Sequence, residues 1–372
     1  MNTTPYETRH ETIDTVIVGA GQAGLATAYH LGRCGHECVV LDRSPRVGDN
    51  WRQQWDSLRL YSPTRYDGLP GLRFPGRPWS YPGKEDVAAY LESYAKHHDL
   101  PVRMGTWVRR IERDGERFTV TTDTGTISCA NVVIATGTFG RTPSIPDFAA
   151  DLDPSILQLH SSEYRRPGQL GPGPVLVVGA SHSGTDIAYE LAEHHETTLA
   201  GRDCGQIPFR LESARMRLVF PVLIFAWRHV LTRRTPIGRK VMPEIRFHGG
   251  PMLRVKRSDL EARHVRRLTE RVEGVRDGRP VLSDGTVVDC ATVVWATGFQ
   301  QVFDWLDLPV IGADGWPQEY RGVSPDVPGL FFCGLSFQYA FSSMVLPGVG
   351  RDAAYVAKQI SSRSRNTVLQ AA

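Results

Sequence analysis

The sequence predicts an α/β protein built from two Rossmann-like units of the same plan. Residues 16–30 and 175–192 each combine an apolar strand, a Gly-rich turn and a helix. Each copy runs on to another apolar strand that ends in Ala-Thr-Gly. The distance from the first Gly of the turn to the last Gly of that strand is 118 residues in one copy (Gly19 to Gly137) and 119 in the other (Gly179 to Gly298). The repeated pattern and spacing indicate two units.

The residue types of the first turn are those that a dinucleotide requires. Gly19 permits the tight bend after the strand, Gly21 lets the backbone approach a pyrophosphate, and Gly24 lets the helix pack on the strand. The helix then points its N-terminal amides at the phosphates. Asp42 ends the next strand, 23 residues beyond Gly19, where a carboxylate accepts hydrogen bonds from ribose hydroxyls. We therefore predict a dinucleotide site here rather than an ordinary Gly-rich turn.

The second copy differs from the first at two positions. Ser181 replaces the middle Gly and adds some crowding without closing the site. Arg202 stands at the offset that Asp42 holds in the first copy. A guanidinium suits a 2′-phosphate, which it binds through charge-assisted hydrogen bonds. The first site is therefore assigned to FAD and the second to NADPH; the alternative is that Arg202 is a solvated surface arginine beside Asp203.

The end of the chain indicates that the second unit is inserted into the first. After Gly298 the chain forms another apolar strand at 329–334 and a helix over about 351–360. A discontinuous FAD domain over residues 1–146 and 299–372 and an NADP domain over 147–298 follow from this order, with crossovers near 141–146 and 298–303. Hairpins are predicted at 117–128, around Asp123-Thr124-Gly125, and at 280–289, around Asp284-Gly285.

Composition excludes several classes of protein. The net charge of +3 over 372 residues is too mild to indicate nucleic-acid binding. The polar N-terminus lacks the pattern of a secretory signal, so a cytoplasmic location is expected. Six scattered cysteines, without a CxxC pair, favour reduced thiols and indicate no metal site.

Further motifs follow the first unit. Gly48-Asp49-Asn50-Trp51 comes first, and a helix with Val87, Tyr90, Leu91 and Tyr94 on one face closes the stretch. Between them lie the elements Asp56-Ser57-Leu58-Arg59-Leu60, Pro63, Leu69-Pro70, Phe74-Pro75 and Tyr81-Pro82. The order of motifs, from Thr15 to about Ile360, resembles the flavin-containing monooxygenases. These are class B flavoprotein monooxygenases, and the pattern is most similar to short bacterial and plant YUCCA-type members.

The resemblance extends the set of expected cofactor residues. It implies that Gly48 to Trp51 wraps the flavin and that His160 and Tyr164 belong to the family's FxGxxxHxxxY signature, whose Phe and Gly positions are Pro154 and Ile156 here. The residues expected to bind FAD are Gly19, Gly21, Gln22, Ala23, Gly24, Asp42, Arg43, Asn50, Trp51, Ala135, Thr136, Gly137 and Gly334. Those expected to bind NADPH are His160, Tyr164, Gly179, Ser181, Ser183, Gly184, Arg202, Ala296, Thr297 and Gly298.

The resemblance also implies the reaction. NADPH reduces FAD, O₂ adds to the reduced flavin, and the peroxyflavin delivers one oxygen atom to a small apolar or aromatic substrate. Tyr164 stands where the Baeyer–Villiger branch has Trp, which favours oxidation at N or S, or oxidative decarboxylation of a 2-oxo acid, over oxygenation of a ketone. An NADPH oxidase or electron donor, a redox sensor and a disulfide oxidoreductase are the alternatives. Cys34 and Cys38 bracket a helix–strand turn, which disfavours the last.

No acid or base is nominated as catalytic. Tyr61 and Ser62 stand where animal members place an Asn over the flavin, and aromatic residues follow the last strand. The candidate pocket residues are Tyr61, Ser62, Phe337, Gln338 and Tyr339. The oligomeric state is not predicted.

The segment 205–257, called the basic segment below, is the least generic part of the chain. It surrounds the uncharged run 218–227 with twelve Lys and Arg and only two acids, Glu212 and Glu244. The run is too short to cross a bilayer, which takes about 20 residues. The alternatives are an element that rests on a membrane surface, the lining of an apolar substrate route, or a helical excursion packed on the protein with its arginines solvated.

Overall fold

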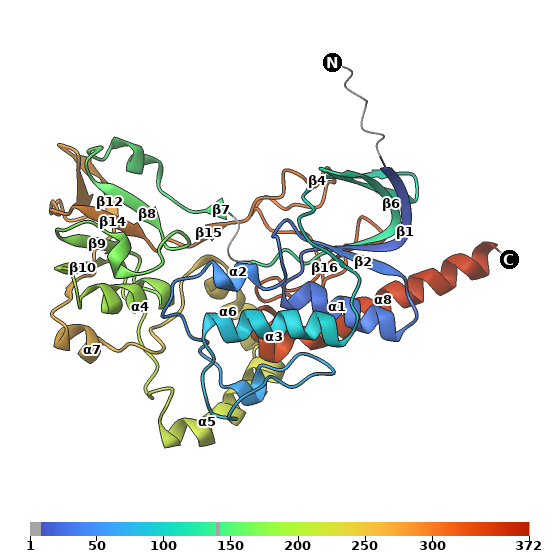
Figure 1. Ribbon diagram of the computed structural model, residues 1–372, viewed down its shortest axis with the longest axis horizontal. Coiled ribbons are helices and arrows are strands. Elements are labelled where there is room, and N and C mark those ends of the chain that lie inside the picture. Colours follow the sequence, from blue (N-terminus) through green and yellow to red (C-terminus); the bar gives the residue numbers. More distant parts are fainter. Residues whose placement is uncertain (1–8, 139–141, 372) are drawn as a thin grey trace, which may run out of the picture.

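Two lobes, each built around its own β-sheet, make up the molecule (Figure 1). The computed structural model describes residues 9–138 and 142–371. The lobe with both ends of the described chain is called the first lobe, and the other the second lobe. Arg141, at the start of the predicted first crossover, lies outside the described residues.

The sheet of the first lobe has seven strands in the order β3-β2-β1-β6-β5-β4, with β16 paired to β6. Its strands are β1 (Arg9–Val18), β2 (Cys38–Leu41), β3 (Val102–Arg103), β4 (Val108–Asp114), β5 (Arg117–Thr122), β6 (Gly125–Ile134) and β16 (Leu330–Phe332). β16 pairs in parallel with β6, so a strand from the end of the chain completes the sheet begun at Arg9. β5 and β6 form the predicted hairpin at 117–128.

Three long helices, α1, α3 and α8, belong to the first lobe (Figure 1). They are α1 (Gln22–Arg33), α3 (Lys84–His97) and α8 (Leu346–Ala371). Val87, Tyr90, Leu91 and Tyr94 of α3 are all buried, as the sequence predicts. The last helix begins five residues before the predicted Arg351 because its first turn packs against the core through Leu346 and Val349.

The sheet of the second lobe has five parallel strands in the order β11-β10-β9-β14-β8. They are β8 (Leu157–His160), β9 (Val175–Val178), β10 (Thr197–Ala200), β11 (Arg266–Leu268) and β14 (Thr292–Trp295). Helix α4 (His182–Leu191) follows β9, in the same relation that α1 has to β1. β9, β10 and β14 are buried along their whole length.

The prediction for the second hairpin is only partly right. The main turn lies at Asp277-Gly278, between β12 (Val272–Arg276) and β13 (Arg279–Leu282). Both residues have positive φ, at 51° and 73°. The predicted turn at Asp284-Gly285 exists as a tighter return, held by a single bridge between Val281 and Val287. The sequence signal of Asp284-Gly285 was therefore real, but β13 pairs mainly with the strand before it.

Two antiparallel strands join the lobes. They are β7 (Thr142–Pro143) and β15 (Phe299–Gln300), one from each predicted crossover. The chain therefore leaves the first lobe and returns to it side by side, as an inserted unit requires. The exact domain bounds 1–146, 147–298 and 299–372 stay a prediction.

The basic segment forms three helical elements between β10 and β11. They are α5 (Ala214–Phe225), a π-helical turn (Ala226–Val230) and α6 (Pro236–Phe247), and α7 (Arg257–Ala262) begins at its end. The remaining elements are α2 (Asp49–Arg52) and the 3-10 turns Thr64–Tyr66, Asp147–Asp151, Pro167–Gln169 and Phe341–Met344. Within the described ranges, no helix has both the length and the apolar character to cross a membrane.

Candidate functional site

The first Gly-rich turn has the geometry of a phosphate cradle. Gly19 has φ of +109°, and a Cβ on Gly19 would lie 2.6 Å from the carbonyl oxygen of Ala135. A Cβ on Gly24 would lie 1.9 Å from the oxygen of Gly19, so helix and turn touch through backbone alone. Nothing lies within 4 Å of a Cβ at Gly21. This open space lies at the uncapped N-terminus of α1, where backbone amides attract an anion, and it fits a pyrophosphate.

Asp42 lies next to this turn, as the offset of 23 residues predicts. Its two carboxylate oxygens accept hydrogen bonds from the Ala20 and Ser44 amides, at 2.7 and 2.8 Å. A carboxylate has about four acceptor sites, so each oxygen can still accept a ribose hydroxyl. Gly334, at the end of β16, approaches the same helix, since a Cβ there would lie 2.7 Å from that of Ala23. The residues predicted for FAD at 19–24, 42, 135–137 and 334 therefore surround one turn.

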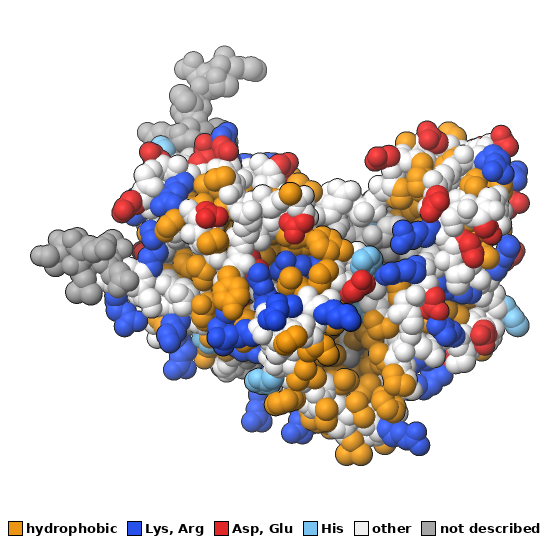
Figure 2. Space-filling model, turned by 180° about the vertical axis from the view of Figure 1, so that it is seen from behind, with side chains coloured by type: hydrophobic (Ala, Val, Ile, Leu, Met, Phe, Trp, Pro, Cys, Tyr) orange, Lys and Arg blue, Asp and Glu red, His pale blue; other side chains and the backbone are white. Residues whose placement is uncertain are grey.

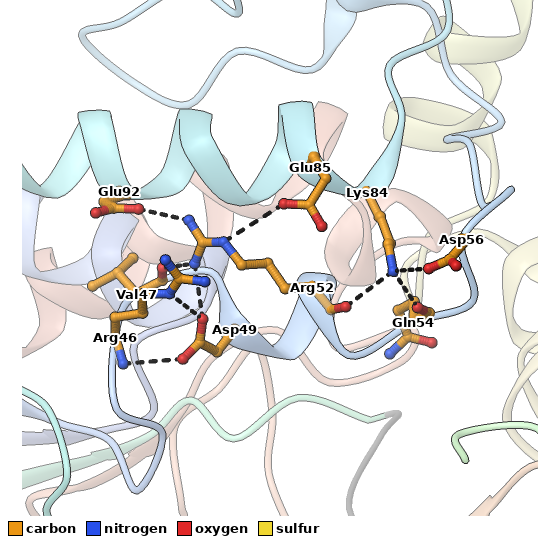
Figure 3. A network of polar contacts seen from close by, with 9 residues as sticks. All are labelled: Arg46, Val47, Asp49, Arg52, Gln54, Asp56, Lys84, Glu85 and Glu92. Atoms are coloured by element: carbon orange, nitrogen blue, oxygen red, sulfur yellow. Dashed lines mark hydrogen bonds and ion pairs between the residues drawn. The ribbon is translucent and has the colours of Figure 1, made fainter. Parts of the chain in front are cut away.

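An ionic network fixes the segment that carries Asn50 and Trp51 (Figure 3). Arg52 donates to the Asp49 carboxylate at 2.9 Å and to Glu92 of α3 at 2.6 Å. Arg46 donates to the same Asp49 oxygen at 2.8 Å. Burial raises the pKa of the Asp49 carboxyl, but these hydrogen bonds outweigh it and lower the pKa below its ordinary value. Asp49, through Arg52, thus anchors α2 to α3.

Close packing explains the glycine before that network. Gly48 has φ of +87°, and a Cβ on it would lie 2.6 Å from the carbonyl oxygen of Ala88 in α3. Lys84, at the start of α3, donates to the carbonyls of Arg52 and Gln54 and to Asp56 (Figure 3). The Asn50 side chain is exposed and that of Trp51 is half-buried, so both are accessible at the surface of the first lobe.

The second Gly-rich turn repeats the backbone of the first. Gly179 has φ of +108°, and a Cβ on Gly184 would lie 1.8 Å from the Gly179 oxygen. Ser181, which replaces the middle Gly, donates its hydroxyl to the Gly250 carbonyl at 2.9 Å. A serine at this position ordinarily caps the helix, but here the hydroxyl points to the basic segment, so the first amides of α4 stay free for an anion.

Arg202 is exposed at the end of β10, next to a group of other arginines. Asp203, its neighbour in the sequence, pairs instead with Arg257. Arg267, half-buried beside them, donates to the carbonyls of Leu199 and Gly201. Within the described part of the chain, no carboxylate lies within 4.0 Å of the Arg202 guanidinium. Sequence reasoning found Arg202 by its offset but missed Arg257 and Arg267, which are distant in the chain.

His160 ties the second Ala-Thr-Gly to the strand beside it. Its Nε2 lies 2.9 Å from the Gly298 carbonyl and its Nδ1 lies 2.8 Å from the Ser162 hydroxyl. Because a carbonyl only accepts, Nε2 carries the hydrogen. Burial lowers the pKa of His160, although the bond to Gly298 opposes the shift, so the ring is neutral at physiological pH. The ring orients the second site and has no nitrogen left for proton transfer.

Tyr164 lies in the core of the second lobe. It is fully buried, and its hydroxyl donates to Glu190 of α4 at 3.0 Å. The structure thus gives Tyr164 a packing role, and its contact with NADPH stays a prediction.

Tyr61 connects the two lobes. Its hydroxyl donates to Asp186 of α4 at 2.9 Å, and its ring lies 5.3 Å from that of His182. Burial raises the pKa of Asp186 to about 6 and lowers that of His182 to about 4. Arg254 of the basic segment donates to the Leu60 carbonyl at 2.8 Å. A loop of the first lobe is therefore fixed to the helix that begins at the second turn.

Ser62 belongs to a different contact, inside the first lobe. Its hydroxyl donates to Asp67 at 2.5 Å. Asp67 is fully buried, and burial raises the pKa of its carboxyl to about 8. The carboxyl is therefore mostly protonated at neutral pH. Neither Asp67 nor Asp186 gave any signal in the sequence, because a single Asp in a loop or helix is ordinarily solvated.

The predicted turn after β16 is held by arginines of the basic segment. Arg246 donates to the Ser336 carbonyl, and Arg233 to the Gln338 carbonyl, both at 3.1 Å. Glu319 pairs with both guanidinium groups, at 2.6 Å for Arg233 and 3.5 Å for Arg246. The expectation that the arginines are solvated is wrong for these two, because buried carbonyls need donors and guanidinium groups supply them.

The three pocket candidates in this turn have different surroundings. Phe337 and Gln338 are fully buried, whereas Tyr339 is half-exposed. Two guanidinium groups lie against the Tyr339 ring, Arg321 at 4.2 Å and Arg351 at 4.8 Å from its centre. Tyr339 is therefore the accessible member of the three.

Known proteins share this arrangement. The model of the family described as pyridine nucleotide-disulphide oxidoreductase matches residues 16–207. An "uncharacterized oxidoreductase CzcO-like" of Geobacillus kaustophilus is 34% identical over 350 residues, 94% of this chain and 98% of that protein. The rice protein "indole-3-pyruvate monooxygenase YUCCA1" is 36% identical over 200 residues, 52% of this chain and 49% of its own. The structure of a flavin-containing monooxygenase from Stenotrophomonas maltophilia superposes with a TM-score of 0.75 at 26% identity, covering 95% and 99% of the two chains.

The chain belongs to the class B flavoprotein monooxygenases, FAD- and NADPH-dependent enzymes within the pyridine nucleotide-disulphide oxidoreductase family. All six cysteines are free, and Cys38 is buried while Cys34 is exposed, so the two form no disulfide. The resemblance noted from the motifs is confirmed.

Proposed function

We propose that this enzyme takes two electrons from NADPH and uses them to place one atom of O₂ in a small apolar or aromatic substrate, while the other atom leaves as water. The atom oxidised is N or S, or the carbonyl carbon of a 2-oxo acid that loses CO₂. The bound flavin supplies the oxygen chemistry. The residues of the chain bind the two nucleotides, fix the lobes against each other and exclude water.

The observation that carries this proposal is the contact between Tyr61 and Asp186. Tyr61 lies in a loop of the first lobe, whose turn fits FAD, and Asp186 lies about one turn into α4, whose N-terminus fits NADPH. Electrons pass between two nucleotides only if their sites face each other. A part-buried hydrogen bond between these two elements supports such an arrangement.

The cofactor assignments follow from charge. The carboxylate of Asp42 suits ribose hydroxyls and repels a 2′-phosphate, whereas the Arg202 guanidinium, with Arg257 nearby, attracts one. We therefore propose FAD at the first turn and NADPH at the second, with the contact residues named from the sequence.

Oxidative decarboxylation of a 2-oxo acid has the most specific support among the reactions. The rice relative is named for indole-3-pyruvate, a 2-oxo acid.

Water exclusion is supported by aromatic contacts between the basic segment and the first lobe, such as Trp227 with Phe341 at 5.0 Å and Phe220 with Tyr66 at 5.2 Å.

Isotope labelling tests the proposal. The purified holoenzyme is given NADPH and ¹⁸O₂ with a 2-oxo acid (phenylpyruvate), a thioether or a tertiary amine, and a cyclic ketone, and both labelled product and H₂O₂ are measured per NADPH consumed. One ¹⁸O atom in the product of the acid, thioether or amine is expected. Label only in the ketone product would assign Baeyer–Villiger chemistry instead. H₂O₂ equal to NADPH, with no labelled product from any substrate, would establish an oxidase and overturn the proposal.

A further inference from the structure

Helix α5 exposes a row of large apolar side chains. Leu218, Val222 and Phe225 are 80%, 64% and 59% exposed. Their spacing of four and three residues places them on one side of the helix. Of the eleven exposed large hydrophobic residues in the described part of the chain, six lie in the basic segment. The surface of this segment therefore differs from that of the rest of the molecule.

The opposite side of α5 already makes the contacts that the fold needs. Met216, Phe220 and Ile224 are 1%, 1% and 6% exposed, and they pack in one cluster with Tyr66 and Tyr81 of the first lobe. A helix on the surface of a protein in water ordinarily carries polar residues on its outer side. The outer row of α5 is thus apolar without any role in the core.

Positive charge accompanies this row. The basic segment has twelve Lys and Arg against two acids, a net charge of +10, while the whole chain has +3, so all other residues together carry −7. Arg215 and Arg217, in the first turn of α5, are exposed, and so are Arg234, Arg239 and Lys240 beyond it. Within residues 9–138 and 142–371, none of these five side chains has a carboxylate within 4.0 Å. Figure 2 shows a group of hydrophobic side chains at the bottom of the molecule, with basic side chains at its edges.

We propose that the outer side of α5 docks on the surface of an anionic lipid bilayer, with Leu218, Val222 and Phe225 in the acyl boundary and the arginines at the headgroups. Interfacial helices combine an apolar row with flanking Lys and Arg, and they bury that row only about 5–10 Å deep. Long arginine side chains reach from such a depth to the phosphates. This inference concerns localisation and is independent of the proposed reaction.

Charge favours a bilayer over a second copy of the chain. In a two-fold dimer the same surface meets itself, so the arginines beside α5 would face the same arginines of the partner. Like charges across an interface are unfavourable, whereas anionic headgroups attract each basic residue by about 1 kcal/mol.

Vesicle co-sedimentation tests the proposal with the full-length holoenzyme. Phosphatidylcholine vesicles with and without phosphatidylglycerol are used at low and high salt. Binding to the anionic vesicles at low salt and weaker binding in high salt or without phosphatidylglycerol are expected. The double substitution Leu218→Ser/Phe225→Ser is expected to lower the partition coefficient at least about tenfold. Arg215→Ser/Arg217→Ser is expected to lower it about fivefold per arginine.

Matched substitutions on the second lobe serve as controls. Leu157→Ser/Val287→Ser removes two exposed apolar side chains, and Arg271→Ser/Arg276→Ser removes two exposed arginines, both away from α5. Both controls are expected to bind vesicles like the wild type. Flavin content and NADPH oxidation without vesicles are expected to be unchanged in Leu218→Ser/Phe225→Ser, which shows that it is folded.

Three results would overturn the proposal. One is wild-type protein that stays in the supernatant with anionic vesicles at low salt. Another is equal vesicle binding by wild type and the folded Leu218→Ser/Phe225→Ser variant. The third is a dimer of the wild type in sedimentation velocity that this variant converts to a monomer, which would identify a second copy as the occupant.

Discussion

The two Gly-rich turns have nearly the same backbone and different surroundings. Gly19 and Gly179 have φ of +109° and +108°, and each helix approaches its turn so closely that only Gly fits three residues after the middle position. The middle positions differ. Gly21 faces open space, whereas Ser181 is hydrogen-bonded to Gly250 of the basic segment. Glycine thus determines the shape of both cradles, and under the proposed assignment the residues around them select the nucleotide.

The helices after the turns differ in the same way. Seven residues beyond the first Gly, α1 has Ala26, which is buried, and α4 has Asp186, which is half-buried. Ala26 fills space in the core of the first lobe, while Asp186 accepts a hydrogen bond from Tyr61 of the other lobe. At this position α1 packs within its own lobe, whereas α4 carries a contact with the other lobe.

The largest effect is expected from Gly21→Val. Because no atom lies within 4 Å of the new Cβ, the protein still folds, but the side chain fills the space for the pyrophosphate. FAD affinity is expected to fall at least about 100-fold, or about 2.7 kcal/mol, so that the purified protein is colourless. The flavin absorbance per protein and the circular dichroism melt measure this. Gly32→Val in the same helix, also in open space, is the control and is expected to stay yellow; a yellow Gly21→Val protein would mean that FAD binds elsewhere.

Arg202→Ala tests the charge difference between the turns. The KM for NADPH is expected to rise about 10- to 150-fold, the equivalent of about 1.5–3 kcal/mol of charge-assisted bonding, while the KM for NADH changes little. Steady-state kinetics with both coenzymes measure the effect, and Arg271→Ala, exposed on the same lobe, is the control. An equal rise for NADPH and NADH would refute a role in binding the 2′-phosphate.

The contact between Tyr61 and Asp186 predicts a pH dependence of stability. The pKa of Asp186 is about 6 in the folded protein, raised from 3.8, so the folded state holds this proton more tightly than the unfolded chain does. The stabilisation that this tighter proton binding gives the folded state is complete below about pH 4 and is lost as the pH rises through 6. Asp186→Asn keeps an acceptor for Tyr61 and removes the titration. At pH 8 it is expected to be more stable than the wild type by about 1–2.5 kcal/mol, a difference that shrinks toward pH 5.

Urea unfolding between pH 5 and 8 measures this difference. Asp304→Asn, which changes an exposed carboxyl, is the control and is expected to follow the wild type throughout. A constant offset between Asp186→Asn and wild type at every pH would contradict the titration of Asp186. Asp186→Ala leaves the half-buried Tyr61 without the acceptor of its hydroxyl and is expected to cost about 1–3 kcal/mol.

The smallest effect is expected from Ser181→Ala. The substitution removes the hydrogen bond to Gly250 and is expected to lower the free energy of unfolding by about 0.5–1.5 kcal/mol without loss of flavin. Ser183→Ala, two residues along the same helix, is the control, since its hydroxyl has no hydrogen bond among the described residues. If both variants unfold alike, the contact with the basic segment does not contribute to stability.

Local patterns predicted most of the fold. The two turns, α1, β2, α3 and the hairpin at 117–128 were placed from strand and helix periodicity and from glycine. Each of these depends on neighbours in the chain. The prediction at 280–289 found the turn at Asp284-Gly285 but missed the longer hairpin of β12 and β13, whose turn at Asp277-Gly278 lies seven residues earlier.

The candidate site was predictable to the extent that it repeats a motif. Gly19, Asp42, Gly179 and Arg202 have fixed offsets within each copy. Asp67, Asp186, His182 and Gly250 have none, because what makes them special is burial and contact with residues far along the chain. The arginines of the basic segment show the same limit: their number is visible in the sequence, but which ones hold the turn after β16 and which face solvent is not.

The sequence by itself determined the backbone of both cradles, because a φ near +110° and a contact through backbone alone admit only glycine. It also determined the charge beside each cradle, because the length of the next strand fixes which residue follows it. Only the tertiary structure decided how the lobes are joined, which carboxyls are buried, and that α5 has one row in the core and one in solvent. Those properties depend on which distant segments share a surface, and burial acts on a side chain through its surroundings rather than through its place in the chain.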